Sequence, residues 1–205
     1  MGAAKRISDL DIPRIGATIG VGEDEVHAFM DIEAAGSGFD SEGRPKLLFE
    51  PHVVHRNLSG AKRAAAVKAG LAYAKWGAKP YPKDSYPRLV AAMAIEEAAA
   101  LKSASWGLTQ ILGENFKAAG FPSIRAMVQA FMDDEAAHLE ATVKLLVAWK
   151  VDDDLPASLA GCRRDLERPR LEEEPLRFRT SPRPIPSGRG FTHRRRERGA
   201  PAPWR

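Results

Sequence analysis

The sequence has a single cysteine, Cys162, among its 205 residues. One cysteine cannot form an intramolecular disulfide, so the chain lacks the covalent framework of small secreted folds. No cluster of cysteine and histidine has the spacing of a zinc site either. We therefore expect a fold that a hydrophobic core stabilises, with no metal and no other cofactor.

Long hydrophobic runs are also missing. No stretch is long enough to cross a bilayer, and the N-terminal MGAAKRISDLDIPRIG has no apolar segment of the kind that a secretory signal requires. The hydrophobic and charged fractions, 44% and 28%, are those of an ordinary globular protein. These features predict a chain without a membrane segment or signal peptide, synthesised in the cytoplasm.

Lysine is absent from the last part of the chain. Residues 161–205 contain 13 arginines and six acidic residues, and seven of the 15 prolines fall between positions 169 and 203. Such a segment cannot bury enough apolar surface to offset its chain entropy. We predict one domain over residues 1–158 and a disordered tail over 159–205. The positive net charge belongs to the tail, so we expect no nucleic-acid partner for the domain.

What the first 160 residues do contain is much alanine and leucine, which predicts a mainly helical fold. Apolar residues recur at helical spacing in several segments. We expect helices over residues 8–19, 23–35, 60–75, 88–102, 109–119 and 123–149. Leu47 to Phe49, after a Glu42-Gly43 turn, is the best strand candidate and predicts half of a small β-hairpin.

Glu33 is the first candidate for chemistry. It lies between Ile32 and Ala34, where a helix with an apolar face ends against a glycine-rich turn. A carboxyl group among apolar neighbours has a raised pKa and stays protonated near neutral pH. That protonated state is what a general acid for glycosidic cleavage needs. From spacing alone, the commoner alternative is a glutamate that ends a helix in solvent.

A second cluster, LFEPHVVH, holds Glu50, His52 and His55. These groups suit a catalytic base, a metal site or a structural Glu–His pair. The metal interpretation is weak, because the segment lacks the helical histidine pair of zinc proteases and Pro51 argues against a helix here.

The stretch SASWGLTQILGEN places polar side chains around two glycines. Trp106 is suited to stacking on a sugar ring, and Ser105, Gln110 and Asn115 to hydrogen-bonding hydroxyl and N-acetyl groups. The alternative is a buried tryptophan at a corner between helices.

Together, EAAGSGFDSEGRPKLLFEPH and AAALKSASWGLTQILGENF resemble the two most distinctive motifs of the N-acetylmuramidase domain of phage and prophage endolysins. That family has the pattern E-S-G-G-x-G-F-x-x-x-G-R-P-x-x-L-F-E-x-H, followed downstream by S-x-S-W-G-x-x-Q-x-M-G-x-N. The resemblance runs in register over about residues 8–150.

The resemblance implies a lysozyme-like helical fold and hydrolysis of the β-1,4 bond between N-acetylmuramic acid and N-acetylglucosamine. It makes Glu33 the expected general acid and leaves Glu50 and Asp40 as candidates for a second carboxylate. The implied protein is a monomer that binds peptidoglycan glycan strands after release to the cell wall. The remaining motif positions, implied to bind substrate, are His52, Ser105, Trp106, Gln110 and Asn115.

Two departures from the family pattern leave alternatives open. Ala34-Ala35 stands where the family tends to have Ser-Gly, and nothing after about residue 160 matches. Our hypothesis is that the arginine- and proline-rich tail is read out of frame. The alternatives are a lytic transglycosylase of the same fold, or an inactive prophage remnant that only binds glycan.

Overall fold

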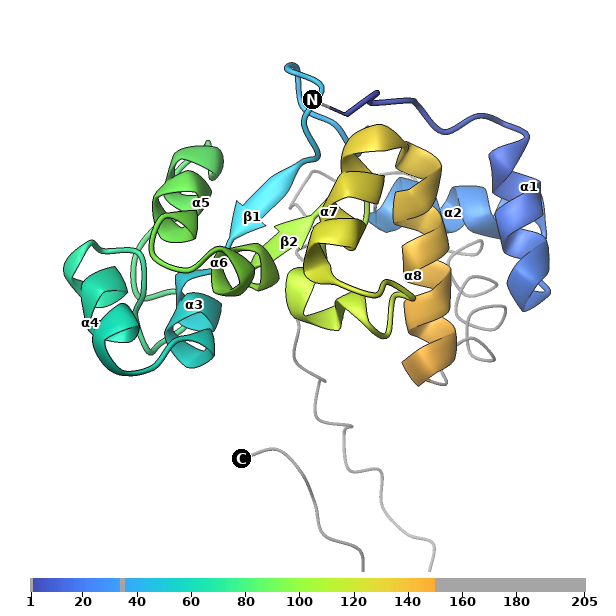
Figure 1. The fold of residues 1–205 in the computed structure, drawn as a ribbon. Helices are drawn as coiled ribbons and strands as arrows, with labels where there is room; N and C mark the ends of the chain where they lie inside the picture. The colour runs from blue at the N-terminus through green and yellow to red at the C-terminus, as the bar shows by residue number, and fades with distance from the viewer. Residues whose placement is uncertain (1, 34–35, 150–205) are drawn as a thin grey trace, which may run out of the picture. The chain divides into compact units, whose positions relative to one another are not determined.

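The computed structural model describes residues 2–33 and 36–149, without the side chains of residues 31–33. Within these ranges the chain is mainly helical and has one three-stranded antiparallel sheet (Figure 1). The predicted mainly helical class with a small β-hairpin is therefore confirmed. The tail predicted over 159–205 lies outside the described residues. In the part that is described, no helix is long and apolar enough to cross a membrane.

The connections between the elements differ in length, and the longest, residues 69–85, joins α4 to α5. The first half contains α1 (Asp11–Gly16), the 3₁₀ helix η1 (Ala17–Ile19), α2 (Glu23–Glu33), β1 (Leu47–Phe49), α3 (Pro51–Asn57) and α4 (Gly60–Lys68). The second half contains α5 (Tyr86–Met93), α6 (Glu97–Lys102), β2 (Ala104–Trp106), β3 (Ile111–Leu112), the 3₁₀ helix η2 (Gly113–Phe116), α7 (Ile124–Asp133) and α8 (Glu135–Trp149).

The sheet joins the two motifs that the sequence singles out. The predicted strand at Leu47 to Phe49 is present as β1, and it pairs with β2 so that Leu47 lies opposite Trp106. The hairpin itself is formed by β2 and β3. Segments more than 50 residues apart in the sequence therefore lie side by side in one sheet.

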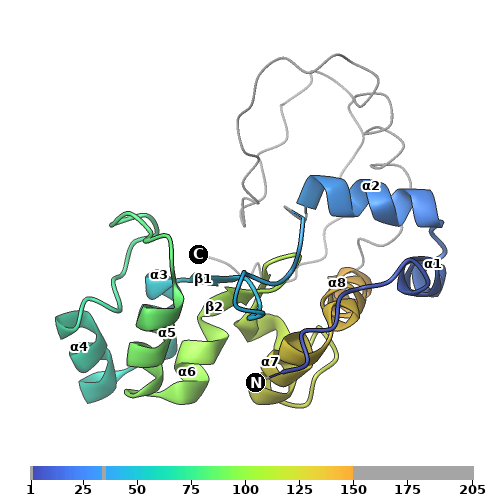
Figure 2. The same cartoon turned by 90° about the horizontal axis from the view of Figure 1, so that it is seen from above.

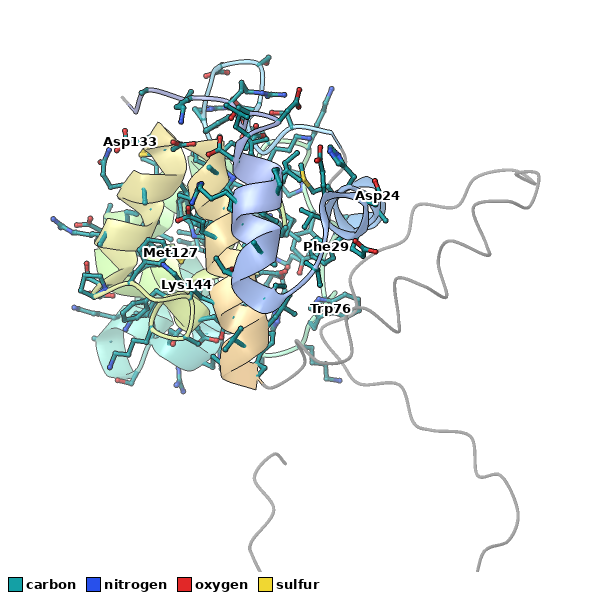
Figure 3. All side chains as sticks on the ribbon, turned by 90° about the vertical axis from the view of Figure 1, so that its right-hand side faces the viewer. Asp24, Phe29, Trp76, Met127, Asp133 and Lys144 are labelled. Carbon is teal, nitrogen blue, oxygen red and sulfur yellow. The ribbon has the colours of Figure 1, made fainter. Side chains whose placement is uncertain are left out.

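Two hydrophobic clusters hold the helices in place. The larger packs α3, α5, α6 and α7 around the sheet, with Phe49, Met127 and Phe131 fully buried. The smaller joins α1, α2 and α8 through residues such as Ile15 and Leu139. Figure 3 shows α1 lying along α8 with α2 beside it. The smaller cluster thus fixes α2, the helix that ends at Glu33.

The segment expected as one helix over 123–149 is broken in two. Asp134 has an extended backbone, with φ −147°, and its Oδ1 accepts the Ala136 amide at 2.9 Å. An aspartate whose side chain binds an amide two residues on is a good N-cap, and here it starts α8. The break matters because it turns Glu135 into the first residue of a helix.

The expected helix over 88–102 is also two helices. Glu96 adopts an extended conformation between α5 and α6, and its side chain accepts the Ala99 amide as an N-cap. The expectation that Glu96 lies in mid-helix is therefore wrong.

Two further expectations fail for local reasons. Pro51 does not prevent a helix: it is the first residue of α3, where its missing N–H would have had no helical partner. The segment expected as a helix over 109–119 contains β3 and the short η2, because Ile111 and Leu112 pair with β2.

Candidate active site

The site is built around the end of α2. Glu33 is the last residue of this helix, and its side chain and the following Ala34-Ala35 lie outside the described part of the chain. The next described residue, Gly36, has φ +80°, a left-handed conformation that glycine adopts without strain. The chain turns here from α2 toward the sheet.

A buried carboxylate holds the loop that follows. Glu135, 2% exposed, accepts the Gly38 amide and, at 3.3 Å, the Ser37 hydroxyl on the same oxygen, Oε1. The first motif is thus fixed to the start of α8 within five residues of Glu33.

The imidazole of His138 lies under the same loop and also under the second motif. A side-chain Cβ at either Gly38 or Gly107 would lie 2.6 Å from His138 Nδ1, so only glycine fits at both positions. The Leu108 amide donates to the same Nδ1 at 3.1 Å. The two motifs, nearly 70 residues apart, therefore meet on one histidine.

His138 is fixed in one tautomer by these contacts. Because Nδ1 accepts a hydrogen bond, Nε2 carries the hydrogen and donates to the Phe131 carbonyl at 2.8 Å. Burial lowers the pKa of His138, only partly offset by that bond and by Glu135. The ring lies between Phe39 and Phe131, at centroid distances of 5.4 and 4.3 Å. With both ring nitrogens hydrogen-bonded, His138 is a structural centre on which the two motifs pack.

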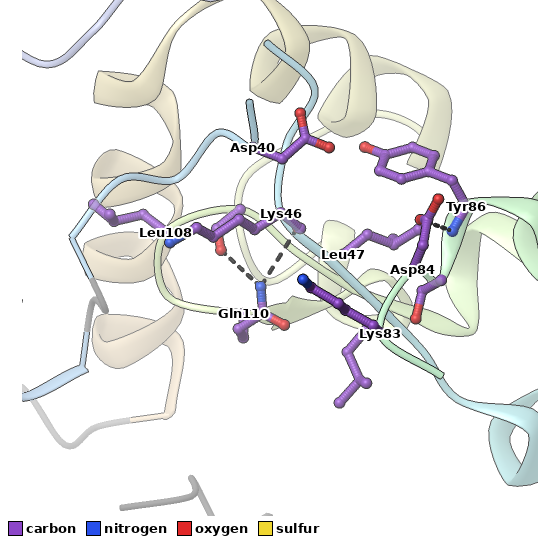
Figure 4. A pocket seen from close by; sticks show the side chains of 11 residues that line it. Asp40, Lys46, Leu47, Lys83, Asp84, Tyr86, Leu108 and Gln110 are labelled. Atoms are coloured by element: carbon purple, nitrogen blue, oxygen red, sulfur yellow. Dashed lines mark hydrogen bonds between the residues drawn. The ribbon is translucent and has the colours of Figure 1, made fainter. Parts of the chain in front are cut away.

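A groove of about 430 Å³ opens above these contacts (Figure 4). Its floor includes β1, and residues of both motifs and of the loop between α4 and α5 form its walls. Figure 2 shows that α2 and this loop rise on the same side of the sheet. The lining residues are Asp40, Lys46, Leu47, Leu48, Lys83, Asp84, Ser85, Tyr86, Gly107, Leu108 and Gln110.

Gln110 is the predicted substrate-binding residue that the structure places in the lining of this groove. Its backbone has φ +53°, an uncommon conformation for a residue other than glycine. Its Nε2 donates to the carbonyls of Gly107, at 2.8 Å, and Lys46, at 3.4 Å (Figure 4). These bonds use Nε2 and leave the amide oxygen as an acceptor, which lies on the side of Lys83 in Figure 4.

Trp106 does not have the predicted role. Its side chain is 2% exposed, and Nε1 donates to the Leu101 carbonyl at 3.0 Å inside the larger core. A ring without an exposed face cannot stack on a sugar. The burial of Trp106 therefore argues against the predicted stacking. The alternative of a buried tryptophan fits this burial but not the position, since Trp106 lies in β2 and not at a corner between helices.

Glu50, His52, Ser105 and Asn115 are not among the residues that line the groove. Glu50 follows β1, its Oε2 accepts the Tyr81 hydroxyl at 2.7 Å, and His52 Nδ1 lies 3.4 Å from the same oxygen. Ser105, in β2, and Asn115, in η2, are half-buried. Among the residues that the structure describes, no three potential ligand side chains are grouped so that they could hold a metal ion.

Sequence reasoning missed four residues of the site. Lys83 and Asp84 line the groove from a proline-rich loop that carries no helical or strand pattern. Glu135 and His138 fall within the segment 123–149, whose apolar spacing predicts one continuous helix and singles out neither residue. The signal that could have revealed them is DDEAAH, where an aspartate followed by glutamate is typical of a helix start.

Comparisons with known proteins agree with this arrangement. A family model described as Muramidase, N-acetylmuramidase, matches residues 23–159. Among solved structures, the crystal structure of the Burkholderia AP3 phage endolysin is similar, with a TM-score of 0.68 and 36% sequence identity over 78% of this chain. The match spans 62% of that endolysin's chain. No curated protein matches. The chain belongs to the N-acetylmuramidase family.

Proposed function

We propose that the chain is a peptidoglycan hydrolase that cleaves the β-1,4 bond between N-acetylmuramic acid and N-acetylglucosamine. The observation that carries this proposal is the meeting of the two motifs at His138. The contacts of Gly38 and Gly107 with that ring hold the loop after α2 against the Gly107 turn, and residues near each of these glycines, Asp40 and Gln110 among them, line one groove. An acid-catalysed glycosidase requires a carboxylic acid at the cleft that holds the scissile bond, and Glu33 precedes the loop that these contacts fix.

In this proposal Glu33 is the general acid. Its carboxyl group donates a proton to the glycosidic oxygen as the sugar becomes oxocarbenium-like. Its support is the position of Glu33 at the end of α2 and its match to the first motif's glutamate. The loop held by Glu135 and His138 fixes the backbone on the far side of the turn.

Asp40 and Glu50 are the two candidates for the second catalytic carboxylate. Asp40 lines the groove, but Oδ1 accepts the Glu42 and Arg44 amides and Oδ2 binds the Arg44 guanidinium. These bonds and the nearby charge hold the pKa of Asp40 below its usual value against the opposing effect of burial. Both carboxylate oxygens of Asp40 therefore bind groups of the turn that follows it.

Glu50 is the better proposal for that second group. Its described contacts use Oε2, and its side chain is 12% exposed. It directly follows β1, which lines the groove, and is bound by Tyr81 from the same loop as Lys83. We propose that Glu50 activates water or attacks the sugar, and the groove side chains of Lys83 and Gln110 bind the glycan.

The test uses three chains on purified peptidoglycan: the wild type, Glu33→Gln, and Glu23→Gln as a control in the first turn of the same helix. We expect the wild type and the control to clear the suspension and Glu33→Gln to lose at least 1,000-fold in rate. Mass spectrometry of the products distinguishes the reaction. Reducing muramic acid ends support hydrolysis, anhydro ends indicate a transglycosylase, and no products from folded wild type indicate an inactive glycan-binding remnant.

A further inference from the structure

Glu135 is a buried carboxylate that the proposed reaction does not use. It is the first residue of α8, and its side chain is 2% exposed. Burying a charged group is costly unless other groups satisfy its hydrogen bonds and balance its charge. The identity of its partners therefore indicates what the residue does.

The two oxygens of this carboxylate face different segments. Oε1 accepts the Gly38 amide and the Ser37 hydroxyl, both in the loop after Glu33. Oε2 accepts the Ile7 amide at 3.1 Å, and it lies 3.3 Å from Nε of Arg6. Arg6 also donates to the Ser37 hydroxyl. Glu135 thus links the N-terminal segment directly to the loop beside the proposed active site.

The N-terminal segment is itself fixed to the junction of α7 and α8. The Ala4 amide donates to the Met132 carbonyl at 3.0 Å and the Lys5 amide to the Asp133 carbonyl at 2.9 Å. The Glu135 amide in turn donates to the Lys5 carbonyl at 2.9 Å. Backbone bonds on both sides therefore hold the partners of Oε2 in place, so the carboxylate has one available orientation.

We propose that Glu135 is a positioning residue, whose carboxylate holds the Ser37-Gly38 loop and thereby sets the place of Glu33 at the groove. The inference rests on the proposed function, because it concerns the geometry of its general acid. Displacing a catalytic group by about 1 Å can cost on the order of 100-fold in rate. Gly38 is only five residues from Glu33, so a shift of this loop reaches the acid.

A neutral side chain of the same shape cannot replace this carboxylate. All four groups that face it are donors: two amides, one hydroxyl and one guanidinium. An amide at this position would direct its own N–H₂ at two of those donors. Either the loop or the N-terminal segment would then lose its partner.

The experiment compares Glu135→Gln with Glu140→Gln. Glu140 lies on the same helix, is partly exposed and forms an ion pair with Arg14, so its replacement removes a charge without touching the loop. On purified peptidoglycan, at a temperature where circular dichroism shows folded protein, we expect kcat of Glu135→Gln to fall at least 30-fold with KM within threefold. Glu140→Gln keeps both constants within twofold. A merely structural role would lower the melting temperature and leave kcat of the folded protein unchanged.

Hydrogen exchange of the Gly38 amide gives a readout without activity. We expect at least tenfold faster exchange in Glu135→Gln than in the wild type or in Glu140→Gln. A kcat within threefold of wild type, or unchanged exchange at Gly38, overturns the proposal. If the wild type releases no product, the proposed function fails and the exchange rate alone decides whether Glu135 holds the loop.

A second variant covers the case in which Glu135→Gln does not fold. Arg6→Met removes an exposed side chain that contacts both Glu135 and Ser37. We expect kcat to fall at least threefold and Gly38 exchange to accelerate at least threefold. Wild-type values for both quantities contradict the proposal.

Discussion

The chain contains two Glu–His pairs, and the structure gives them different environments. Glu135 and His138, three residues apart in α8, are 2% and 0% exposed, and both ring nitrogens of His138 are hydrogen-bonded. Glu50 and His52, at the start of α3, have side chains that are 12% and 20% exposed. His52 Nδ1 lies 3.4 Å from Glu50 Oε2 but has no hydrogen-bond partner among the described residues.

This difference indicates different roles. Polar groups that are buried and fully hydrogen-bonded hold the backbone around them, and they have no capacity left for a substrate. A partly exposed pair with an unsatisfied nitrogen, directly after a strand that lines the groove, can change partners when a ligand arrives. We therefore propose that the α8 pair positions the backbone beside the site and that the pair at β1 and α3 takes part in the chemistry.

The largest effect is expected at the buried pair. His138→Ala removes a fully buried ring and leaves the Leu108 amide and the Phe131 carbonyl without partners. We expect a loss of about 4 kcal/mol in the free energy of unfolding, measured in urea. His27→Ala, on the exposed face of α2, serves as the control and should change stability by less than about 0.5 kcal/mol. A loss below about 1.5 kcal/mol at His138 would mean that the ring is not the centre on which the motifs pack.

The second-largest effect tests whether Glu50, of the pair Glu50 and His52, takes part in the reaction. We expect Glu50→Gln to lower kcat about 100-fold on peptidoglycan while it changes stability by only about 1 kcal/mol. Glu97→Gln, which removes an exposed ion pair with Arg125, controls for the loss of a charge and should leave kcat unchanged. If kcat of Glu50→Gln stays within threefold of wild type, Glu50 does not take part in the reaction and the proposed difference between the two pairs is wrong.

We expect the pH dependence of stability to arise mainly from His138, the more deeply buried histidine of the two pairs. Burial is the main cause that lowers the pKa of His138 and of His52, while neighbouring acids such as Glu135 and Glu50 oppose the shift. A lowered pKa in the folded state means that the unfolded chain binds the proton better. Stability is then complete above the unfolded value, near pH 6.5, and is lost as the pH falls toward the folded value.

Urea midpoints measured between pH 7.5 and 5.5 test this dependence. We expect the wild-type midpoint to fall across that range, and His52→Gln to keep most of the fall because His138 causes it. If the urea midpoint of His52→Gln no longer changes with pH, then His52 rather than His138 causes the pH dependence, and the prediction is wrong.

The smallest effect concerns the hydroxyl that holds Glu50. Tyr81→Phe removes the 2.7 Å hydrogen bond to Oε2 and should cost about 1 kcal/mol of unfolding free energy. Tyr73→Phe is a matched control, since the Tyr73 hydroxyl is buried without a partner in the described ranges. Its loss should be neutral or slightly stabilising. Equal effects of the two variants on the free energy of unfolding would mean that the Tyr81 hydroxyl does not orient Glu50.

Local patterns predicted much of the fold from the sequence. The apolar spacing of α1, α2 and α7 and the strand at Leu47 to Phe49 follow from short-range rules. The breaks at Asp134 and Glu96 were missed because apolar periodicity continues across them. Each break depends on one side chain that accepts a nearby amide, and this choice is decided by tertiary packing.

The candidate site was predictable only in part. Gln110, a motif residue, lines the groove, whereas the burial of Trp106 depends on its packing in the larger core and on its bond to the Leu101 carbonyl. The role of His138 needs two glycines from distant motifs to approach one ring, and no pattern within one segment encodes such an approach. Motif residues can be found in a sequence, but the groups that hold the motifs together depend on long-range contacts.

The measurement that tests the account most directly is a crystal structure of Glu33→Gln with a soluble peptidoglycan tetrasaccharide. We predict that the glycan lies in the groove, in contact with Lys83 and Gln110, with the side-chain amide at position 33 within hydrogen-bond distance of a glycosidic oxygen. A glycan bound elsewhere, or a side chain at position 33 directed away from it, would contradict the claim that the two motifs form one catalytic cleft.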